Sequence, residues 1–482
     1  MSDSSPNQLP PELNMVLNTK GYSLLLQGEV GVGKTELGLE LLANAQNPFY
    51  LSMGGHHSHI HQRYPWLSES LGPDCILDLR KTVRSARQQP SRTTLSTSLS
   101  QIISTKKDIM PTVFINGWNT LLQSLALEPT TWPQWHQALI EIVRRRNWTL
   151  IITTTLPNDL LEELVDGVVH LYRRPVSPVR PVTTLQSTDT TQFEVLCLDI
   201  RKLTGIPIKR RHYVFSIAGQ RFRYLPPSPF AQTSPPPKPI LSSKEQISTG
   251  VREFDNLLNG GYPRGAATLL EVTASVARRR HPLIHAAAVN TLRTGCGLLY
   301  LIEEDIPLDA LINQHLLPFV GQPKLKHLHV SCLPQENIPE CKDIKDEEQW
   351  TEHSGFCQIP LYPDDFEKTS KILMENRQII NDRYDTHLEI IESGTLERVY
   401  TPSILPAFLR TAKDCAYRNN SALLFIADHS TSHRQGLRRL SDFHLLLDAI
   451  EGVPVLQGFT PSFDPHAVEI SQIDGIKLSL IS

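Results

Sequence analysis

The sequence predicts an α/β protein built of two tandem units, each a mostly parallel sheet with helices on both faces. Apolar strands alternate with helices throughout the 482 residues, which is typical of a buried parallel sheet. The pattern of the first half recurs in the second. Between them, residues 225–244 hold seven of the 36 prolines, so this stretch cannot propagate a helix or a central strand. We therefore expect domains at residues 1–224 and 245–482, joined by a linker at 225–244.

The repeat begins with a strand, a loop, a helix and a second strand. The first half reads GYSLLLQGEVGVGKTELGLELLANAQNPFYLS from Gly21, and the second reads GAATLLEVTASVARRRHPLIHAAAVNTLRTGCGLLYLI from Gly265. Each half ends in alternating segments that predict a terminal antiparallel hairpin, FEVLCLDI with HYVFSIA and HAVEISQI with IKLSLI. The polar residues 85–104 and the acidic residues 332–365 fall outside the repeat, so we expect surface insertions there.

The composition excludes several classes of protein. With 47 Lys+Arg against 50 Asp+Glu, the chain has no overall positive charge with which to wrap nucleic acid. Its seven cysteines are scattered and form no CxxC pair, which favours reduced thiols over a disulfide framework. We see no apolar run of membrane-spanning length and no leader in MSDSSPNQLPPELN. We therefore expect a soluble cytoplasmic protein without a membrane partner.

A phosphate-binding loop is the clearest motif. The run GEVGVGKT fits G-x-x-x-x-G-K-[ST], between an expected strand at 23–27 and an expected helix at 35–42. Glycines let backbone N–H groups surround phosphate oxygens, and the helix N-terminus adds partial positive charge. Lys34 should reach the β- and γ-phosphates, and the Thr35 hydroxyl should ligate Mg²⁺. The expected nucleotide-binding residues are Gly28, Glu29, Val30, Gly31, Val32, Gly33, Lys34, Thr35 and Glu36. The alternative is a glycine-rich turn without a ligand.

The sequence offers weaker evidence for residues that would support hydrolysis. The strand at 112–115 runs into Asn116, where a metal-orienting aspartate would be expected. Asn116 has a neutral carbonyl, so it can orient a metal-bound water but contributes no charge. The strand ending at Ser52 continues as Met53-Gly54-Gly55 and offers no acid. The first half therefore resembles a nucleotide binder with a weakened catalytic apparatus.

The second half has lost the loop. A gapless match puts Val272, Ala277, Arg278 and Arg279 where the first half has its first and last glycines, its lysine and its threonine. Without those glycines and that hydroxyl, we do not expect a nucleotide to bind there in the usual manner.

Acidic residues nevertheless follow strands of the second half. Glu303, Glu304 and Asp305 come after the strand ending at Ile302, and Glu392 stands where Asn116 does. One hypothesis is a composite site in which Glu303 and Glu304 supply catalytic acids to the loop of the first half. The alternative is that these acids are surface charges at strand ends.

The residues described so far resemble the RecA/KaiC-like P-loop ATPase superfamily. The resemblance rests on GEVGVGKT in its strand–loop–helix context and on ISTGVREFDNLLNGGYPRGAATLL at Ile247, similar to the segment before the family's first core strand. Within it, FYLSMGGHHSHIHQRYPWLSESLGP, INGWNTL, the arginine clusters and the degenerate second half are similar to archaeal GvpD-like proteins, regulators named from gas vesicle clusters.

This resemblance implies two tandem RecA/KaiC-like P-loop domains, the second one degenerate. It also implies ATP at residues 28–35, Mg²⁺ on Thr35, and Asn116 at the metal-orienting position. Active members usually carry an acidic pair after the second strand, and His56-His57 lie near that place here. Because the family often forms rings or filaments, a homo-oligomer is a possible assembly.

Two further groups of residues have competing interpretations. The run HHSHIH from His56 to His61 could bind a metal such as Zn²⁺, serve as a polar loop beside the nucleotide, or respond to pH. Arginine clusters could contact nucleic acid or an acidic partner if they share a face, or could be solvated surfaces. The clusters are Arg144-Arg145-Arg146, Arg173-Arg174, Lys209-Arg210-Arg211, Arg278-Arg279-Arg280 and Arg438-Arg439.

Three functions remain open from the sequence. The first, which we favour, is an ATP-binding regulator that switches a protein partner with slow or absent hydrolysis. The second is a working ATPase of the recombinase or clock type, acting on DNA or in a ring. The third is a scaffold in which both halves are relics that bind no nucleotide.

Overall fold

The computed structural model divides the chain into two compact units, which meet in the sequence at residues 226 and 227. It describes residues 8–52, 57–78, 111–124, 127–155, 159–176, 193–226, 238–276, 281–302, 307–332, 356–363, 365–471 and 475–481. The expected insertion at 85–104 and most of that at 332–365 lie outside these residues. Every helix in the described ranges is too short or too polar to traverse a lipid bilayer.

The first unit is an α/β layer structure around a 9-stranded sheet. Its helices are α1 (Pro11–Leu17), α2 (Lys34–Ala43), α3 (His57–Arg63), α6 (Trp118–Ser124), α7 (Trp132–Arg146) and α8 (Asp159–Leu164). Its strands are β1 (Ser23–Gln27), β2 (Pro48–Ser52), β3 (Ile76–Asp78), β4 (Thr112–Asn116), β5 (Thr149–Thr154), β6 (Gly167–Val176), β7 (Phe193–Leu203), β8 (His212–Ser216) and β9 (Arg223–Leu225). The strand order is β3-β2-β4-β5-β1-β6-β7-β8-β9, parallel from β3 to β6 and antiparallel from β6 to β9.

The second unit has a 10-stranded sheet and a small two-stranded one. Its helices are α9 (Arg252–Leu257), α10 (His281–Arg293), α11 (Leu308–Ala310), α12 (Leu317–Val320), α13 (Phe366–Arg383), α14 (Ser393–Val399), α15 (Leu405–Arg418) and α16 (Arg434–Leu440). Its strands are β10 (Gln246–Ile247), β11 (Tyr262–Pro263), β12 (Ala267–Val272), β13 (Gly297–Leu301), β14 (Leu328–Cys332), β15 (Cys357–Pro360), β16 (His387–Glu392), β17 (Ala422–Ala427), β18 (Phe443–Ile450), β19 (Val453–Thr460), β20 (Ser462–Ser471) and β21 (Gly475–Leu480).

The two large sheets repeat the same strand order. The second sheet runs β15-β14-β13-β16-β17-β12-β18-β19-β20-β21, so β12 takes the place of β1, β16 that of β4 and β17 that of β5. The duplicated α/β architecture expected from the sequence is therefore present. The second sheet differs by one added edge strand, β15, which comes from the acidic stretch expected to be only a surface insertion. The antiparallel ends are also longer than the expected hairpins, since β6–β9 and β18–β21 each form a four-stranded run.

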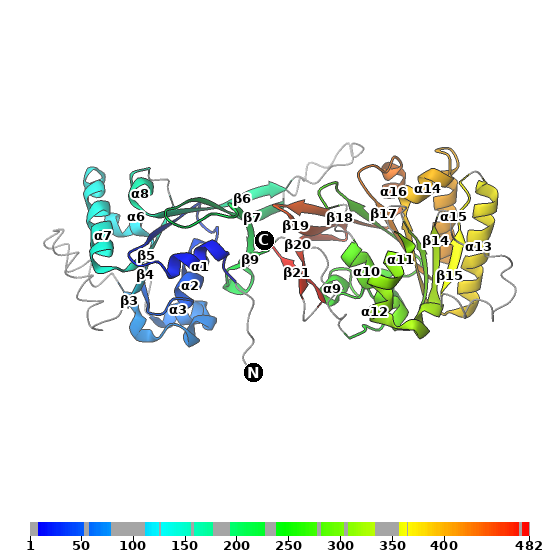
Figure 1. Ribbon diagram of the computed structural model, residues 1–482, viewed down its shortest axis with the longest axis horizontal. Coiled ribbons are helices and arrows are strands. Elements are labelled where there is room, and N and C mark those ends of the chain that lie inside the picture. The colour runs from blue at the N-terminus through cyan, green and yellow to red at the C-terminus, as the bar shows by residue number, and fades with distance from the viewer. Residues whose placement is uncertain are drawn as a thin grey trace. The chain divides into compact units, whose positions relative to one another are not determined.

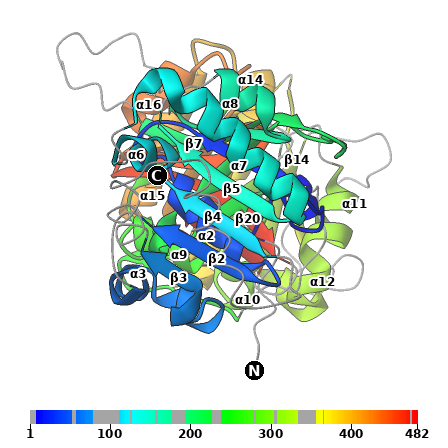
Figure 2. The ribbon, with the colours of Figure 1, turned by 90° about the vertical axis from the view of Figure 1, so that its left-hand side faces the viewer.

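Successive side chains along each parallel strand point to opposite faces of the sheet, and both faces are buried. In the first unit, Leu24 and Leu26 of β1 pack with α1 and α2, whereas Leu25 packs with α6 and α7. Figure 2 shows α7 lying across the strands of this sheet. Because every parallel strand is covered on both sides, its residues are almost continuously apolar.

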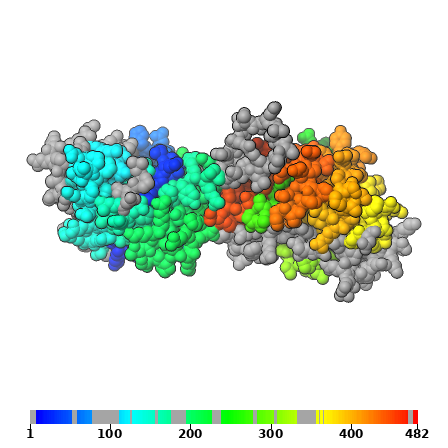
Figure 3. Space-filling view, turned by 90° about the horizontal axis from the view of Figure 1, so that it is seen from above, coloured from blue at the N-terminus to red at the C-terminus, as the bar shows by residue number. Residues whose placement is uncertain are grey.

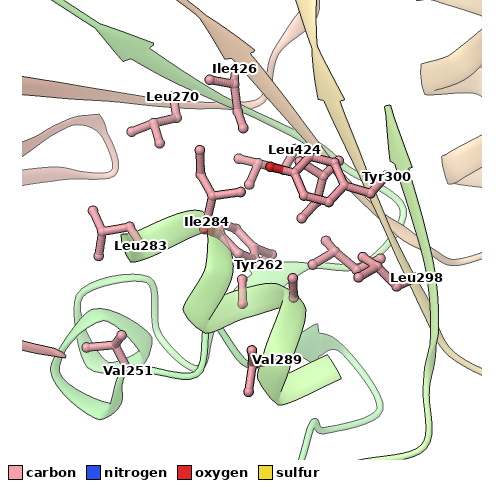
Figure 4. Close-up of a cluster of buried hydrophobic side chains, with 14 of the residues drawn as sticks. Val251, Tyr262, Leu270, Leu283, Ile284, Val289, Leu298, Tyr300, Leu424 and Ile426 are labelled. Atoms are coloured by element: carbon pink, nitrogen blue, oxygen red, sulfur yellow. The ribbon is translucent and has the colours of Figure 1, made fainter. Parts of the chain in front are cut away.

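The second unit follows the same rule. Figure 1 shows α10 and α12 on one face of its sheet and α13 and α15 on the other. In the close-up of Figure 4, Ile284 of α10 points toward Leu270 and Leu424 of the sheet, with Tyr300 beside them. The outward sides of α13, α15 and α16 lie at the molecular surface, in yellow to orange in Figure 3.

Part of the expected linker is attached to the second unit. The backbone N–H of Ile240 donates to Asn290 Oδ1 of α10 at 2.8 Å, and Asn290 Nδ2 donates back to the Ile240 carbonyl at 2.9 Å. Residues 238–244, within the stretch assigned to the linker, therefore lead into the second unit with a fixed contact.

Candidate functional site

The glycine-rich loop at residues 28–33 connects β1 to α2. Gly28 has a φ of +148°, and a Cβ there would lie 2.1 Å from the Leu171 carbonyl oxygen. Gly33 precedes the first residue of α2 with a left-handed φ of 91°. Both positions therefore require glycine, which leaves the backbone N–H groups of the loop and of the helix N-terminus accessible.

Lys34 places a cation inside this loop. Its side chain is buried, and Nζ donates to the Gly28 carbonyl oxygen at 2.7 Å and also to that of Glu29. Burial lowers the pKa of Lys34, and the nearby charges of Glu36 and Glu29 oppose this effect. A buried ammonium without a salt bridge is costly, so an anion bound beside it would be strongly favoured.

A cavity of about 300 Å³ opens beside the loop, at the carboxyl ends of β1, β4 and β5. Its lining residues are Val30, Gly31, Gly33, Lys34, Thr35, Glu36, Arg63, Asn116, Gly117, Asn119, Thr120, Thr153, Thr154 and Thr155. This edge of a parallel sheet is where α/β proteins bind their ligands, and the volume lies at the low end of the usual range for a ligand pocket.

Asn116 lies at the centre of a hydrogen-bond network in this cavity. Its Oδ1 is 2.9 Å from the Thr153 hydroxyl, and its Nδ2 is 3.1 Å from the Tyr50 hydroxyl. Thr35 Oγ1 lies 3.3 Å from Nδ2 and 3.4 Å from Oδ1. The structure thus brings the residue at the end of β4 next to the threonine of the loop.

One buried hydroxyl in the cavity wall has no partner within the described ranges. Thr154 is 2% exposed, and its Oγ1 forms no hydrogen bond to any described residue. A buried polar atom normally finds a partner, so this hydroxyl is available to a polar ligand or a water in the cavity.

Glu36 and Arg63 bring opposite charges to the cavity rim. Glu36 Oε1 accepts a hydrogen bond of 2.9 Å from the Tyr64 hydroxyl. The exposed Arg63 has its guanidinium carbon 5.4 Å from the centre of the Tyr64 ring and makes no ion pair with the described part of the chain. Glu36 was expected from the motif, whereas Arg63 carries no local signal and was missed.

Arg173 of β6 connects the loop to the neighbouring strands. Its Nη2 donates to the Gly31 carbonyl oxygen at 3.2 Å, and its Nη1 forms a 3.1 Å ion pair with Glu194 of β7. The sequence placed Arg173 in a possible surface cluster. Its contact with the loop follows only from the pairing of β6 with β1, which no local pattern reveals.

The described start of the corresponding loop in the second unit, residues 273–276, is hydrogen-bonded to β18. Asp448 of β18 accepts from the hydroxyls of Thr273 and Ser275 at 2.6 and 2.7 Å. A carboxylate in this position would repel a phosphate. Glu303 and Glu304, the acids of the hypothetical composite site, lie outside the described residues, as do residues 277–280.

The described part of the histidine run, residues 57–61, does not form a recognisable metal centre. The first residue of the run, His56, lies outside the described ranges, His59 is exposed, and a ring nitrogen of His61 is 3.0 Å from the Leu71 carbonyl oxygen. Within those ranges, no group of three or more His, Cys, Asp or Glu side chains could hold a metal ion.

Several of the clustered arginines have partners within the chain. Arg144 pairs with Asp166 at 3.2 Å, Arg145 pairs with Glu141, and Arg438 forms a bidentate ion pair with Glu271. The guanidinium of Arg210 lies 5.4 Å from the centre of the Tyr213 ring.

The chain is similar to two known GvpD proteins. The chain is 24% identical to Protein GvpD2 of Halobacterium salinarum over 275 residues, which cover 54% of this chain and 53% of the relative. It is 26% identical to Protein GvpD1 of the same organism over 287 residues, covering 56% and 51%. The chain spans about half the length of the curated relatives it matches. No family model matches it. The similarity to GvpD-like proteins expected from the motifs is thus borne out.

Proposed function

We propose that the chain is an ATP-binding regulatory protein of the GvpD-like and KaiC-like type, linked through this resemblance to gas vesicle clusters. ATP binds in the first unit at residues 28–36 and switches the chain between states that a partner protein distinguishes. Hydrolysis is weak or absent. The second unit keeps the architecture but binds no nucleotide.

The observation that carries this proposal is the buried Lys34 beside an open cavity. Glycine is required at Gly28 and Gly33, the start of α2 faces the cavity, and the Thr154 hydroxyl lacks a partner in the described ranges. A polyphosphate would satisfy each of these groups at once, because its oxygens accept hydrogen bonds and carry the compensating charge.

Arg173 offers a route from nucleotide to partner. It donates to the Gly31 carbonyl and pairs with Glu194, so a change in the loop on binding would act on β6 and β7. We favour a protein over nucleic acid as the partner, because Arg144, Arg173 and Arg438 are engaged within the chain.

Weak hydrolysis follows from the residue at the end of β4. Asn116 supplies no negative charge next to Thr35, where a metal-orienting carboxylate would be needed. Glu36, the only carboxylate among the described lining residues, accepts a hydrogen bond from the Tyr64 hydroxyl. Steady ATP turnover by the purified chain would instead favour the active ATPase.

Calorimetric titration of the full chain with ATP tests the proposal. We expect Lys34→Ala to weaken binding by at least about tenfold, equivalent to about 1.4 kcal/mol. Lys20→Ala is a matched control, since Lys20 is exposed and lies outside the cavity lining. Equal affinity of the wild type and Lys34→Ala would overturn nucleotide binding at this loop, and no binding at all would favour a scaffold.

A further inference from the structure

The donor set beside Thr35 does not suit the magnesium ion that accompanies ATP at such loops. Mg²⁺ prefers oxygen ligands, especially carboxylates, in a regular octahedral arrangement. The orientation of the Asn116 amide therefore decides whether its oxygen or its NH₂ group would face a cation bound beside Thr35.

Thr153 fixes that orientation. The backbone N–H of Gly117 donates to Thr153 Oγ1 at 2.7 Å, which directs the hydroxyl hydrogen of Thr153 elsewhere. Asn116 Oδ1 lies 2.9 Å away and accepts it. The oxygen of the Asn116 amide therefore faces Thr153, and its NH₂ group faces the opposite way.

The NH₂ group of Asn116 consequently faces the loop. It donates to the Tyr50 hydroxyl at 3.1 Å and to Thr35 Oγ1 at 3.3 Å, and Thr35 Oγ1 also lies 3.4 Å from the amide oxygen. The hydrogen bond to Thr35 occupies one of the two lone pairs of Oγ1, and the partial positive charge of the NH₂ group repels a cation bound beside it. Tyr50 and Thr153 thus act as positioning residues for Asn116.

Positive charge for a polyphosphate is available from the chain itself. Lys34 and Arg63 both line the cavity, and Arg63 makes no ion pair with the described residues. The N-terminus of α2, a helix of 10 residues, adds partial positive charge at the same place. Against these stand Glu36 in the lining and Glu29, whose charges both act on Lys34.

We propose that this cavity binds the nucleoside triphosphate in its metal-free form, with Lys34 and Arg63 as counter-charges and with Tyr50 and Thr153 holding the NH₂ group of Asn116 toward Thr35. This inference rests on the proposed function and specifies the ionic form of its ligand. It makes the protein a sensor of metal-free nucleotide, so the nucleotide occupancy falls as free Mg²⁺ rises.

The test is calorimetric binding of ATP to the full chain in excess Mg²⁺ and in excess EDTA. We expect the apparent affinity of the wild type to be at least about tenfold weaker in excess Mg²⁺ than in excess EDTA, because Mg²⁺ leaves only a small fraction of the nucleotide in its metal-free form. Arg63→Gln should weaken binding of metal-free ATP by about tenfold, whereas Arg145→Gln, on the exposed side of α7, should not.

Asn116→Asp should reverse the ionic preference. A carboxylate there repels metal-free ATP and attracts Mg²⁺, so we expect at least about tenfold weaker binding in EDTA than in Mg²⁺. The variant should fold, because the hydroxyls of Tyr50 and Thr153 can both donate to a carboxylate. In the second unit, Tyr300 already donates to Glu392 in the equivalent place at 2.7 Å.

The outcomes separate this inference from the proposed function. A wild type that binds ATP in excess Mg²⁺ as tightly as in EDTA, or more tightly, overturns the metal-free form but leaves ATP binding intact. An Asn116→Asp variant with unchanged metal dependence overturns the role assigned to the amide. Absence of ATP binding in both conditions contradicts the proposed function itself.

Discussion

Asn116 in the first unit and Glu392 in the second end equivalent strands, and each is hydrogen-bonded to a tyrosine on the neighbouring strand. Tyr50 lies 3.1 Å from Asn116 Nδ2, and Tyr300 lies 2.7 Å from Glu392 Oε1. Ser52 pairs with Asn116, which places Tyr50 two residues earlier on β2, and Tyr300 holds the same place on β13. The unit with the phosphate loop thus has the neutral residue, and the unit without the loop has the acid.

Replacing Gly28 by alanine should abolish ATP binding and destabilise the first unit. The added Cβ would lie 2.1 Å from the Leu171 carbonyl oxygen, so the loop must move. We expect a loss of at least about 2 kcal/mol in the unfolding free energy. Urea denaturation followed by tryptophan fluorescence measures it, since five of the six tryptophans lie before residue 226.

Gly72→Ala is the control for Gly28→Ala. Nothing lies within 4 Å of a Cβ at Gly72, and its φ is −65°, which any residue adopts. Its effect should stay within about 0.5 kcal/mol. If both substitutions had the same small effect, the strict need for glycine in the loop would be contradicted.

Arg173→Gln should weaken ATP binding by about three- to tenfold without unfolding the protein. The substitution removes the hydrogen bond to the Gly31 carbonyl and the exposed ion pair with Glu194, and exposed pairs contribute little to stability. Arg173→Lys should keep part of the affinity because it keeps the charge. Titration calorimetry and a thermal melt of each variant distinguish this outcome from a loss of fold.

Removing one partner of the ion pair between Arg377 and Glu389 should destabilise the fold strongly, whereas replacing both partners by apolar residues should cost much less. Both side chains are almost fully buried, at 3% and 2% exposure, and the pair is bidentate. Arg377→Met leaves a buried carboxylate and should cost about 3–5 kcal/mol. The double variant Arg377→Met/Glu389→Leu should recover much of this loss in a circular dichroism melt.

The matched control for that pair is Arg145→Met. Arg145 pairs with Glu141 at the surface, where both side chains are mostly exposed. We expect a change of no more than about 0.5 kcal/mol. A large loss of stability in Arg145→Met, or none in Arg377→Met, would show that burial does not determine how much each ion pair contributes to the unfolding free energy.

His136 should make the first unit less stable in mild acid. Burial lowers its pKa to about 4, and neither ring nitrogen has a hydrogen-bond partner in the described ranges. Because the unfolded histidine takes up a proton near pH 6.5 and the folded one does not, stability falls as the pH drops from about 6.5 to 4. His136→Leu should remove this pH dependence, which amounts to about 2 kcal/mol of unfolding free energy between pH 7.5 and pH 5.

Comparing urea midpoints of the wild type and His136→Leu at both pH values checks this prediction. The variant should gain stability relative to the wild type at pH 5 but not at pH 7.5. The same difference at both pH values would mean that packing, and not protonation, governs the substitution.

Local patterns predicted the parts of the site that are close in the chain. The strand at β1, the loop and the start of α2 follow from GEVGVGKT and its apolar flanks, and Asn116 follows from the end of an apolar strand. The repeat predicted the matching sheets, because alternation of strand and helix survives even where the loop does not.

Contacts between distant strands could not be predicted in this way. Tyr50 reaches Asn116 only because β2 pairs with β4 in one register, and Thr153 does so because β5 is the other neighbour of β4. Arg63 and Arg173 carried no signal beyond their charge. The edge strand β15 was missed since an acidic segment surrounds it in the sequence.

Asp448 makes the asymmetry of the two halves difficult to reverse. Beside the second loop it forms hydrogen bonds with Thr273 and Ser275 and adds a negative charge that would repel a phosphate. Restoring glycines and a lysine there would not be enough, since the aspartate must also be lost. Losing it alone removes one acceptor from Thr273 and Ser275, whose hydroxyls also lie 2.6 Å from each other. A phosphate loop in the second unit would therefore require changes both in the segment after β12 and at Asp448 of β18.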